Sequence, residues 1–149
     1  MYLNNNPNSQ LFTGKNLRLG GSKELYKEKG TVFGDLSAIL IDNMPFWAEY
    51  SSTPSNKVSL MSDWEYKMQA IVDETVNENV TSLAGVPSWM LVLLNTVLET
   101  TKQISLLDVW PNLEVYFHGG VSFLPYVDQY KNILPSKNFK YYEIYNASE

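Results

Sequence analysis

Hydrophobic residues repeat at two different spacings along this chain, and the spacing changes near residue 80. From Trp64 to Val76, apolar side chains recur every three or four positions, which places them on one face of a helix. The residues 62–65, Ser-Asp-Trp-Glu, fit a capping box with Ser62 as the N-cap residue. We therefore predict a helix that starts at Ser62 and packs on the core through its apolar face.

Beyond residue 80, short apolar runs alternate with helical segments. The runs 80–84, 113–117 and 140–145 are rich in β-branched and aromatic residues, as strands are. Between them, residues 88–99 are apolar on nearly all sides and residues 125–133 form a second helical segment. Strands that alternate with helices imply a parallel sheet. We predict an α/β fold whose strand–helix units form part of a parallel or mixed sheet, with helix 88–99 deeply buried.

The first 60 residues show weaker periodicity and more turn-forming residues. Residues 17–19 form a short alternating run, Gly20 and Gly21 indicate a turn, and residues 22–29 favour a helix or loop. The Ser- and Thr-rich stretch 51–55 lacks the glycines of a phosphate-binding loop and is interpreted as a connector. We expect one domain over 1–149, with an irregular region in 1–60 and a helix followed by strand–helix units in 61–149.

Composition excludes several kinds of function. The 149 residues include no cysteine, one histidine and one arginine, and the formal net charge is −5. Disulfides, thiolate metal sites and multi-histidine metal sites are therefore excluded, and nucleic acid is not an expected partner. No apolar run approaches the roughly 18 residues of a membrane span. The N-terminal residues lack the pattern of a signal peptide, so we expect no membrane association and a cytoplasmic location.

Three loops carry the residues of greatest chemical interest. They are Gly85-Val86-Pro87, His118-Gly119-Gly120 and the segment 145–149, and each follows a predicted strand directly. Ligands of parallel sheets bind at the carboxyl ends of the strands. We therefore expect these loops to converge on one edge of the sheet and to form a ligand site there.

The residues in and around these loops resemble the auxin-responsive acyl-acid–amido synthetase family, which belongs to the adenylate-forming enzymes. The resemblance spans nearly the whole chain. The residues that carry it are the segments 14–22, 60–65, 81–89 (Thr-Ser-Leu-Ala-Gly-Val-Pro-Ser-Trp), 109–113 (Val-Trp-Pro-Asn-Leu), 118–120 (His-Gly-Gly) and 145–149 (Tyr-Asn-Ala-Ser-Glu).

The resemblance implies an ATP- and Mg²⁺-dependent reaction in two halves. A carboxylic acid is adenylated by ATP, and the amine of an amino acid then displaces AMP. By the same resemblance, the nucleotide would contact Gly119, Gly120, Tyr145, Asn146, Ala147 and Ser148. The acyl-acid pocket would be lined by Val86, Pro87, Trp89 and His118. Glu149 would bind Mg²⁺.

Residue type alone leaves a structural alternative for several of these positions. Trp89 on an apolar helix is more typical of core packing than of a pocket, and His118 beside two glycines is typical of a hydrogen-bonded turn. Tyr145 fits a packed strand aromatic as well as a base platform. A carboxylate at the chain end, such as Glu149, is usually solvated.

Several of the family's motifs have no counterpart in this chain. They are the Ser/Thr-Ser-Gly-Thr phosphate loop, the downstream Tyr-Arg-x-Gly-Asp ribose motif and the small C-terminal domain. We therefore expect a fragment of the large N-terminal domain of an adenylate-forming enzyme, inactive by itself, which self-associates through helix 88–99 and its sheet edges. Two alternatives stay open: a fragment of an acyl-CoA ligase, or a non-catalytic binding module.

Overall fold

A five-stranded parallel sheet organises the chain. The computed structural model describes residues 2–21, 26–28, 31–33 and 36–145. The strand order in the sheet is β4-β1-β5-β6-β7, and every neighbouring pair is parallel. The strands are β1 (Lys15–Arg18), β4 (Ser52–Thr53), β5 (Val80–Gly85), β6 (Val115–His118) and β7 (Lys140–Glu143). This arrangement confirms the predicted α/β fold.

Eight helices and one 3-10 turn connect the strands in the described part of the chain. They are α1 (Tyr2–Asn5), α2 (Leu36–Asp42), α3 (Phe46–Tyr50), α4 (Asn56–Ser59), α5 (Trp64–Thr75), α6 (Pro87–Thr101), α7 (Leu106–Val109), the turn Leu124–Tyr126 and α8 (Val127–Ile133). Helix α5 leads into β5, α6 connects β5 to β6, and α8 connects β6 to β7.

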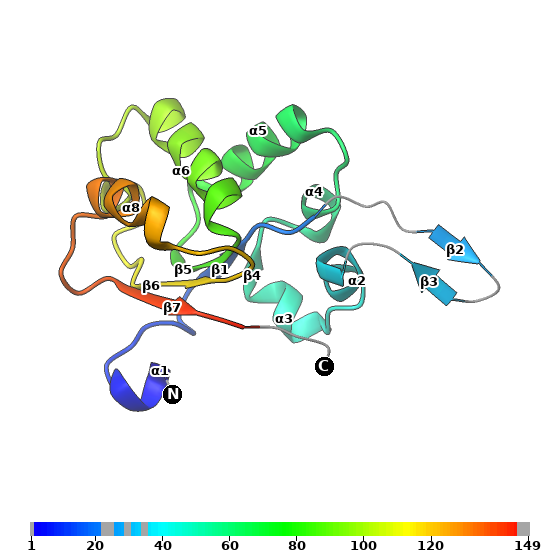
Figure 1. Cartoon of the computed structure of the whole chain (residues 1–149), viewed down its shortest axis with the longest axis horizontal. Coiled ribbons are helices and arrows are strands. Elements are labelled where there is room, and N and C mark those ends of the chain that lie inside the picture. Colours follow the sequence, from blue (N-terminus) through cyan, green and yellow to red (C-terminus); the bar gives the residue numbers. More distant parts are fainter. Residues whose placement is uncertain (1, 22–25, 29–30, 34–35, 146–149) are drawn as a thin grey trace.

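A small hairpin stands apart from the main sheet. Strands β2 (Tyr26–Glu28) and β3 (Thr31–Phe33) pair antiparallel, and Figure 1 shows them extending away from the rest of the chain. The expectation of a helix or loop over 22–29 is therefore wrong for 26–28. The rest of that range lies outside the described residues. A strand of three residues is set by its partner rather than by its own periodicity, which is too short to read.

The main core lies between the sheet and helices α5, α6 and α8, which run along one side of it in Figure 1. Leu17, Leu83 and Tyr116 from the strands are fully buried against Ile71 of α5 and Leu94 of α6. On the opposite face, Tyr2 of α1 packs edge-on against two rings of the sheet. Its ring centroid lies 6.0 Å from that of Phe117 and 5.4 Å from that of Tyr142.

Helix α5 starts one residue later than predicted. Its N-cap is Asp63, whose carboxylate accepts a hydrogen bond from the backbone N–H of Tyr66 at 3.1 Å. Ser62, which we expected in this role, lies outside the helix and is exposed. Both residue types cap helices well, so the capping-box pattern could not distinguish two adjacent candidates.

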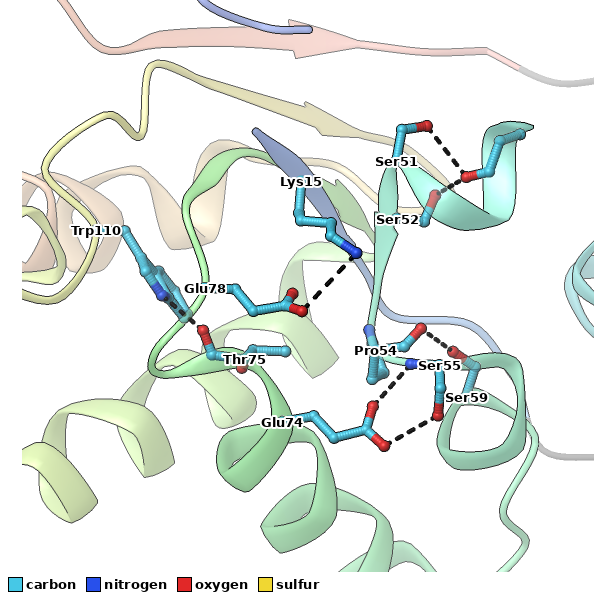
Figure 2. Close-up of polar contacts among 11 residues, drawn as sticks. Lys15, Ser51, Ser52, Pro54, Ser55, Ser59, Glu74, Thr75, Glu78 and Trp110 are labelled. Atoms are coloured by element: carbon cyan, nitrogen blue, oxygen red, sulfur yellow. Dashed lines mark hydrogen bonds and ion pairs between the residues drawn. The ribbon is translucent and has the colours of Figure 1, made fainter. Parts of the chain in front are cut away.

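Polar contacts fasten the edge strand β4 and its following turn to α5 (Figure 2). The carboxylate of Glu74 accepts hydrogen bonds from the backbone N–H of Ser55 at 2.8 Å and from its hydroxyl at 3.0 Å. At the same C-terminal end of α5, the indole of Trp110 donates to the carbonyl of Thr75 at 3.1 Å. A carboxylate of the chain itself thus occupies the donors at Ser55. The interpretation of 51–55 as a connector is wrong for Ser52 and Thr53, which form β4.

Helix α6 is only partly buried. Six of its residues are buried: Pro87, Met90, Leu91, Leu93, Leu94 and Val97. Trp89 and Val92, in contrast, are 54% and 45% exposed. The expectation of a deeply buried helix is therefore wrong for one of its faces, because α5 and the sheet cover only the other. No helix among the described residues has the length and apolar composition of a membrane span.

Candidate ligand cleft at the carboxyl edge of the sheet

An open cleft of about 1160 Å³ lies at the carboxyl ends of the strands. The loop after β5 contributes Gly85 and Val86, and the loop after β6 contributes Gly119 and Gly120. Ile144 and Tyr145 follow β7 and line the same cleft. The described parts of the three predicted loops therefore converge, as the alternation of strands and helices led us to expect.

The glycine pair lets two parts of the cleft wall approach each other. A side chain at Gly119 would collide with the carbonyl oxygen of Ile144, so the β6 loop can cross the end of β7 only with glycine at this position. Gly120 has a φ of +85°, which L side chains rarely adopt. A Cβ atom at Gly120 would also lie 3.3 Å from Cγ2 of Val86. The glycine pair thus lets two segments of the chain itself approach closely, next to Ile144 and Val86.

His118 lies at the base of the cleft within a layer of aromatic rings. Its side chain is 4% exposed and stacks on Phe123, with ring centroids 4.2 Å apart. Nδ1 of His118 is buried and has no hydrogen-bond partner in the described part of the chain. Burial lowers the pKa of the imidazole below its ordinary value of 6.5, and the nearby carboxylate of Glu143 opposes this shift in pKa. The imidazole is therefore held neutral beside the cleft.

The opposite side of the cleft is built by α5, α6 and the end of β1. Trp64 and Trp89 meet there edge-to-face, with ring centroids 4.8 Å apart. Trp89 is therefore a cleft residue and not a core residue, in contrast to what its helix pattern favoured. Trp89 lies in the first turn of α6, which begins two residues after the carboxyl end of β5, and its side chain is 54% exposed.

Lys67 lines the cleft and was missed by sequence reasoning. Its side chain is buried, and Nζ donates hydrogen bonds to the carbonyl oxygens of Gly20 at 3.0 Å and Gly21 at 3.3 Å. The signal was present, because position 67 falls in the apolar stripe between Trp64 and Ile71. A lysine on the buried face of a helix needs polar partners, and here these are the carbonyls that follow β1.

The predicted site residues fall into three groups: residues that line the cleft, a residue that does not, and residues outside the described part of the chain. Val86, Trp89, His118, Gly119, Gly120 and Tyr145 line the cleft. Pro87 is buried behind the wall, with its carbonyl bonded to the hydroxyl of Tyr130, and does not line the cleft. Asn146, Ala147, Ser148 and Glu149 lie outside the described residues. The roles expected for all these residues stay predictions.

An accessible aromatic ring lines the described cleft. The ring of Tyr145 is 83% exposed at the cleft, and the side-chain-free backbone of Gly119 and Gly120 lies nearby in the same wall. An accessible aromatic face can stack on a nucleobase. In contrast, no group of three or more His, Cys, Asp or Glu side chains within the described ranges could hold a metal ion.

The model of the GH3 family N-terminal domain matches residues 9–139, which is most of the chain. The chain belongs to the GH3 family. These are the auxin-responsive acyl-acid amido synthetases, and members of the family are acyl-adenylating enzymes that generally use ATP and Mg²⁺. No curated protein and no solved structure gives a significant match.

The GH3 match covers most of the cleft but not all of it. It includes β1, β4, β5 and β6, together with the loops at 85–86 and 118–120. It ends at residue 139, one residue before β7 begins. The wall formed by Ile144 and Tyr145 thus lies beyond the matched residues. The nucleotide contact predicted for Tyr145 depends on the resemblance of the segment 145–149 to the family.

Proposed function

We propose that this GH3 domain forms part of an ATP-dependent acyl-acid–amido synthetase, which adenylates a carboxylic acid and transfers the acyl group to an amino acid. The observation that supports this proposal best is the convergence of the loops after β5, β6 and β7 on one cleft. The reaction needs a nucleotide and an acid side by side. The cleft has an exposed aromatic ring on one side and two tryptophans on the other. It therefore offers separate surfaces for the nucleotide and for the acid.

The nucleotide would bind on the side of Tyr145. The ring of Tyr145 would stack on adenine, while Gly119 and Gly120 would let the base approach the backbone. Asn146, Ala147 and Ser148 would continue this contact towards the α-phosphate. Glu149 would hold Mg²⁺, which neutralises charge on the phosphates when bound.

The acid would bind between the first turns of α5 and α6. Trp64, Trp89 and Val86 present apolar surface there, which favours an acid with a hydrophobic body. His118 would close the base of the pocket as a neutral imidazole. The carboxylate of the bound acid would then point towards the nucleotide. There it would attack the α-phosphate in line and release pyrophosphate. The amino acid then displaces AMP, and we expect the reaction in the cytoplasm.

The test is an exchange assay on the product of the native gene. Carboxylate-dependent exchange between ATP and pyrophosphate, together with AMP release that depends on an added amino acid, is the expected result. AMP release that depends on coenzyme A would instead indicate an acyl-CoA ligase. Absence of both exchange and nucleotide binding would contradict the proposal and favour a binding module. We expect the 149-residue chain alone to show no exchange and weak or undetectable ATP binding.

A further inference from the structure

Two buried tyrosines lie directly behind the β5–α6 wall of the cleft without lining it. Tyr116 is on β6 and Tyr130 is on α8, and both side chains are 0% exposed. Their rings stack with centroids 5.2 Å apart and an interplanar angle of 22°. Burial raises the pKa of both phenols above their ordinary value, so both hydroxyls keep their hydrogen at neutral pH.

Both hydroxyls are bonded to the backbone of the same loop. The hydroxyl of Tyr116 donates to the carbonyl of Gly85 at 2.9 Å, and that of Tyr130 donates to the carbonyl of Pro87 at 2.8 Å. The two hydroxyl oxygens lie 3.4 Å apart. A phenol has one hydrogen to donate, so the shorter contacts with the carbonyls take precedence. The two tyrosines therefore hold the residues on both sides of Val86.

The position of Val86 matters for the shape of the cleft. Val86 lines the cleft and stands against Gly120 on the opposite loop, where an added Cβ would be 3.3 Å from its Cγ2. Trp89, in the first turn of α6, follows Pro87 by two residues and contacts Trp64. Movement of the Pro87 carbonyl would thus shift both Val86 and Trp89.

We infer that Tyr130, supported by Tyr116, is a positioning residue that sets the position of Val86 against Gly120 in the cleft wall and the orientation of Trp89. It acts through the backbone carbonyl of Pro87 and touches no ligand. An effect of Tyr130 on which acid is bound rests on the proposed function. The effect of Tyr130 on the position of the cleft wall does not. The inference is therefore testable in the unliganded chain.

The experiment compares Tyr130→Phe with Tyr141→Phe by ¹⁹F NMR of chain labelled with 5-fluorotryptophan. Tyr141 is the matched control, because its ring belongs to the same aromatic cluster while its buried hydroxyl has no hydrogen-bond partner among the described residues. The four tryptophan signals are assigned by single Trp→Phe substitutions. We expect Tyr130→Phe to shift the signals of Trp89 and its neighbour Trp64, with those of Trp47 and Trp110 unchanged.

Every outcome decides the inference. Unchanged Trp89 and Trp64 signals in Tyr130→Phe would overturn it, and so would an equal shift in Tyr141→Phe. If Tyr130→Phe fails to fold, Tyr116→Phe removes the bond to Gly85 and is judged by the same criterion.

A native gene product that shows exchange adds a second readout: Tyr130→Phe should raise KM for the acid several-fold while kcat changes less. A Trp89 shift in the chain, together with neither exchange nor nucleotide binding by the native gene product, would contradict the proposed function and leave the positioning role intact.

Discussion

At the scale of single residues, His118 makes the cleft sensitive to pH. It is the only histidine, it is buried, and burial lowers its pKa below 6.5. In the unfolded chain His118 takes up its proton at the ordinary pKa, whereas the folded chain resists protonation until a lower pH. The folded state therefore loses stability relative to the unfolded state as pH falls below about 6.5.

We predict that His118→Phe reduces this loss of stability. Phenylalanine keeps the stacking on Phe123 but cannot take up a proton. The free energy of unfolding, measured by urea titration between pH 7 and pH 5, should fall less steeply in the variant. Glu143→Gln should lower the pKa of His118 further, as followed by ¹H NMR of its ring, because it removes the opposing charge. Parallel pH profiles for wild type and His118→Phe would contradict the prediction.

A second prediction concerns Gly119. A methyl group there would collide with the carbonyl of Ile144, which is backbone and cannot turn aside. We expect Gly119→Ala to lower the free energy of unfolding by about 1–3 kcal/mol. Ser122→Ala in the same loop is exposed and should change it by less than about 0.5 kcal/mol. An equal effect of both substitutions in urea titrations would show that the crossing of the β6 loop over β7 is not tight.

Backbone chemistry indicated the place of Gly119 and Gly120 in the cleft wall, whereas helical periodicity favoured the core for Trp89 and gave no role to Lys67. Only the family resemblance assigned Trp89 to a pocket. Gly119 and Gly120 follow a buried strand, so their place at the sheet edge follows from the alternation of strands and helices. Trp89 and Lys67 lie on helix faces, and the side chain that such a face buries depends on neighbouring elements. Helical periodicity alone could therefore not reveal that Trp89 borders the cleft or that Lys67 reaches the Gly20 and Gly21 carbonyls.

At the scale of elements, long periodic segments were predictable and short ones were not. Helices α5 and α6 and strands β5 to β7 match predicted segments to within a few residues at their ends. Strand β4 has two residues, and it exists because Ser52 and Thr53 pair with Asn16 and Leu17 of β1. A pairing between distant segments leaves no local periodic signal, so the sequence around β4 was interpreted as a connector.

The start of α5 gives the third prediction. Asp63 caps the helix through the N–H of Tyr66, whereas Ser62 precedes the cap. We expect Asp63→Ala to lower the free energy of unfolding by about 1 kcal/mol. Ser62→Ala should leave it nearly unchanged, which makes the adjacent position a matched control. Thermal or urea unfolding of the two variants decides between the caps, and a larger loss in Ser62→Ala would restore the cap expected from the sequence pattern.

At the scale of the whole molecule, two consecutive helices, α2 and α3, together expose five large apolar side chains. On α3, the side chains of Phe46, Trp47 and Tyr50 are 82%, 72% and 75% exposed. On α2, Leu36 and Leu40 are 66% and 60% exposed. Helix α6, from which we expected self-association, exposes less apolar surface, and it borders the cleft.

We therefore predict that the chain self-associates through α2 and α3. Neighbouring apolar side chains lose contact with water when two copies meet, and such exposure is unusual for a monomer. Size-exclusion chromatography with light scattering should give an average mass above 17.0 kDa that rises with protein concentration. Trp47→Ser combined with Phe46→Ser should lower that mass towards the monomer.

Two control variants separate this surface from the rest of the molecule. Ile104→Ser removes an apolar side chain that is 89% exposed but lies outside α2 and α3, so it should leave the concentration dependence unchanged. Val92→Ser tests α6 in the same way. A lower mass in Val92→Ser alone would place the contact on α6, as the sequence first suggested. A wild-type chain that stays monomeric at high concentration would show that the α2 and α3 side chains do not mediate self-association.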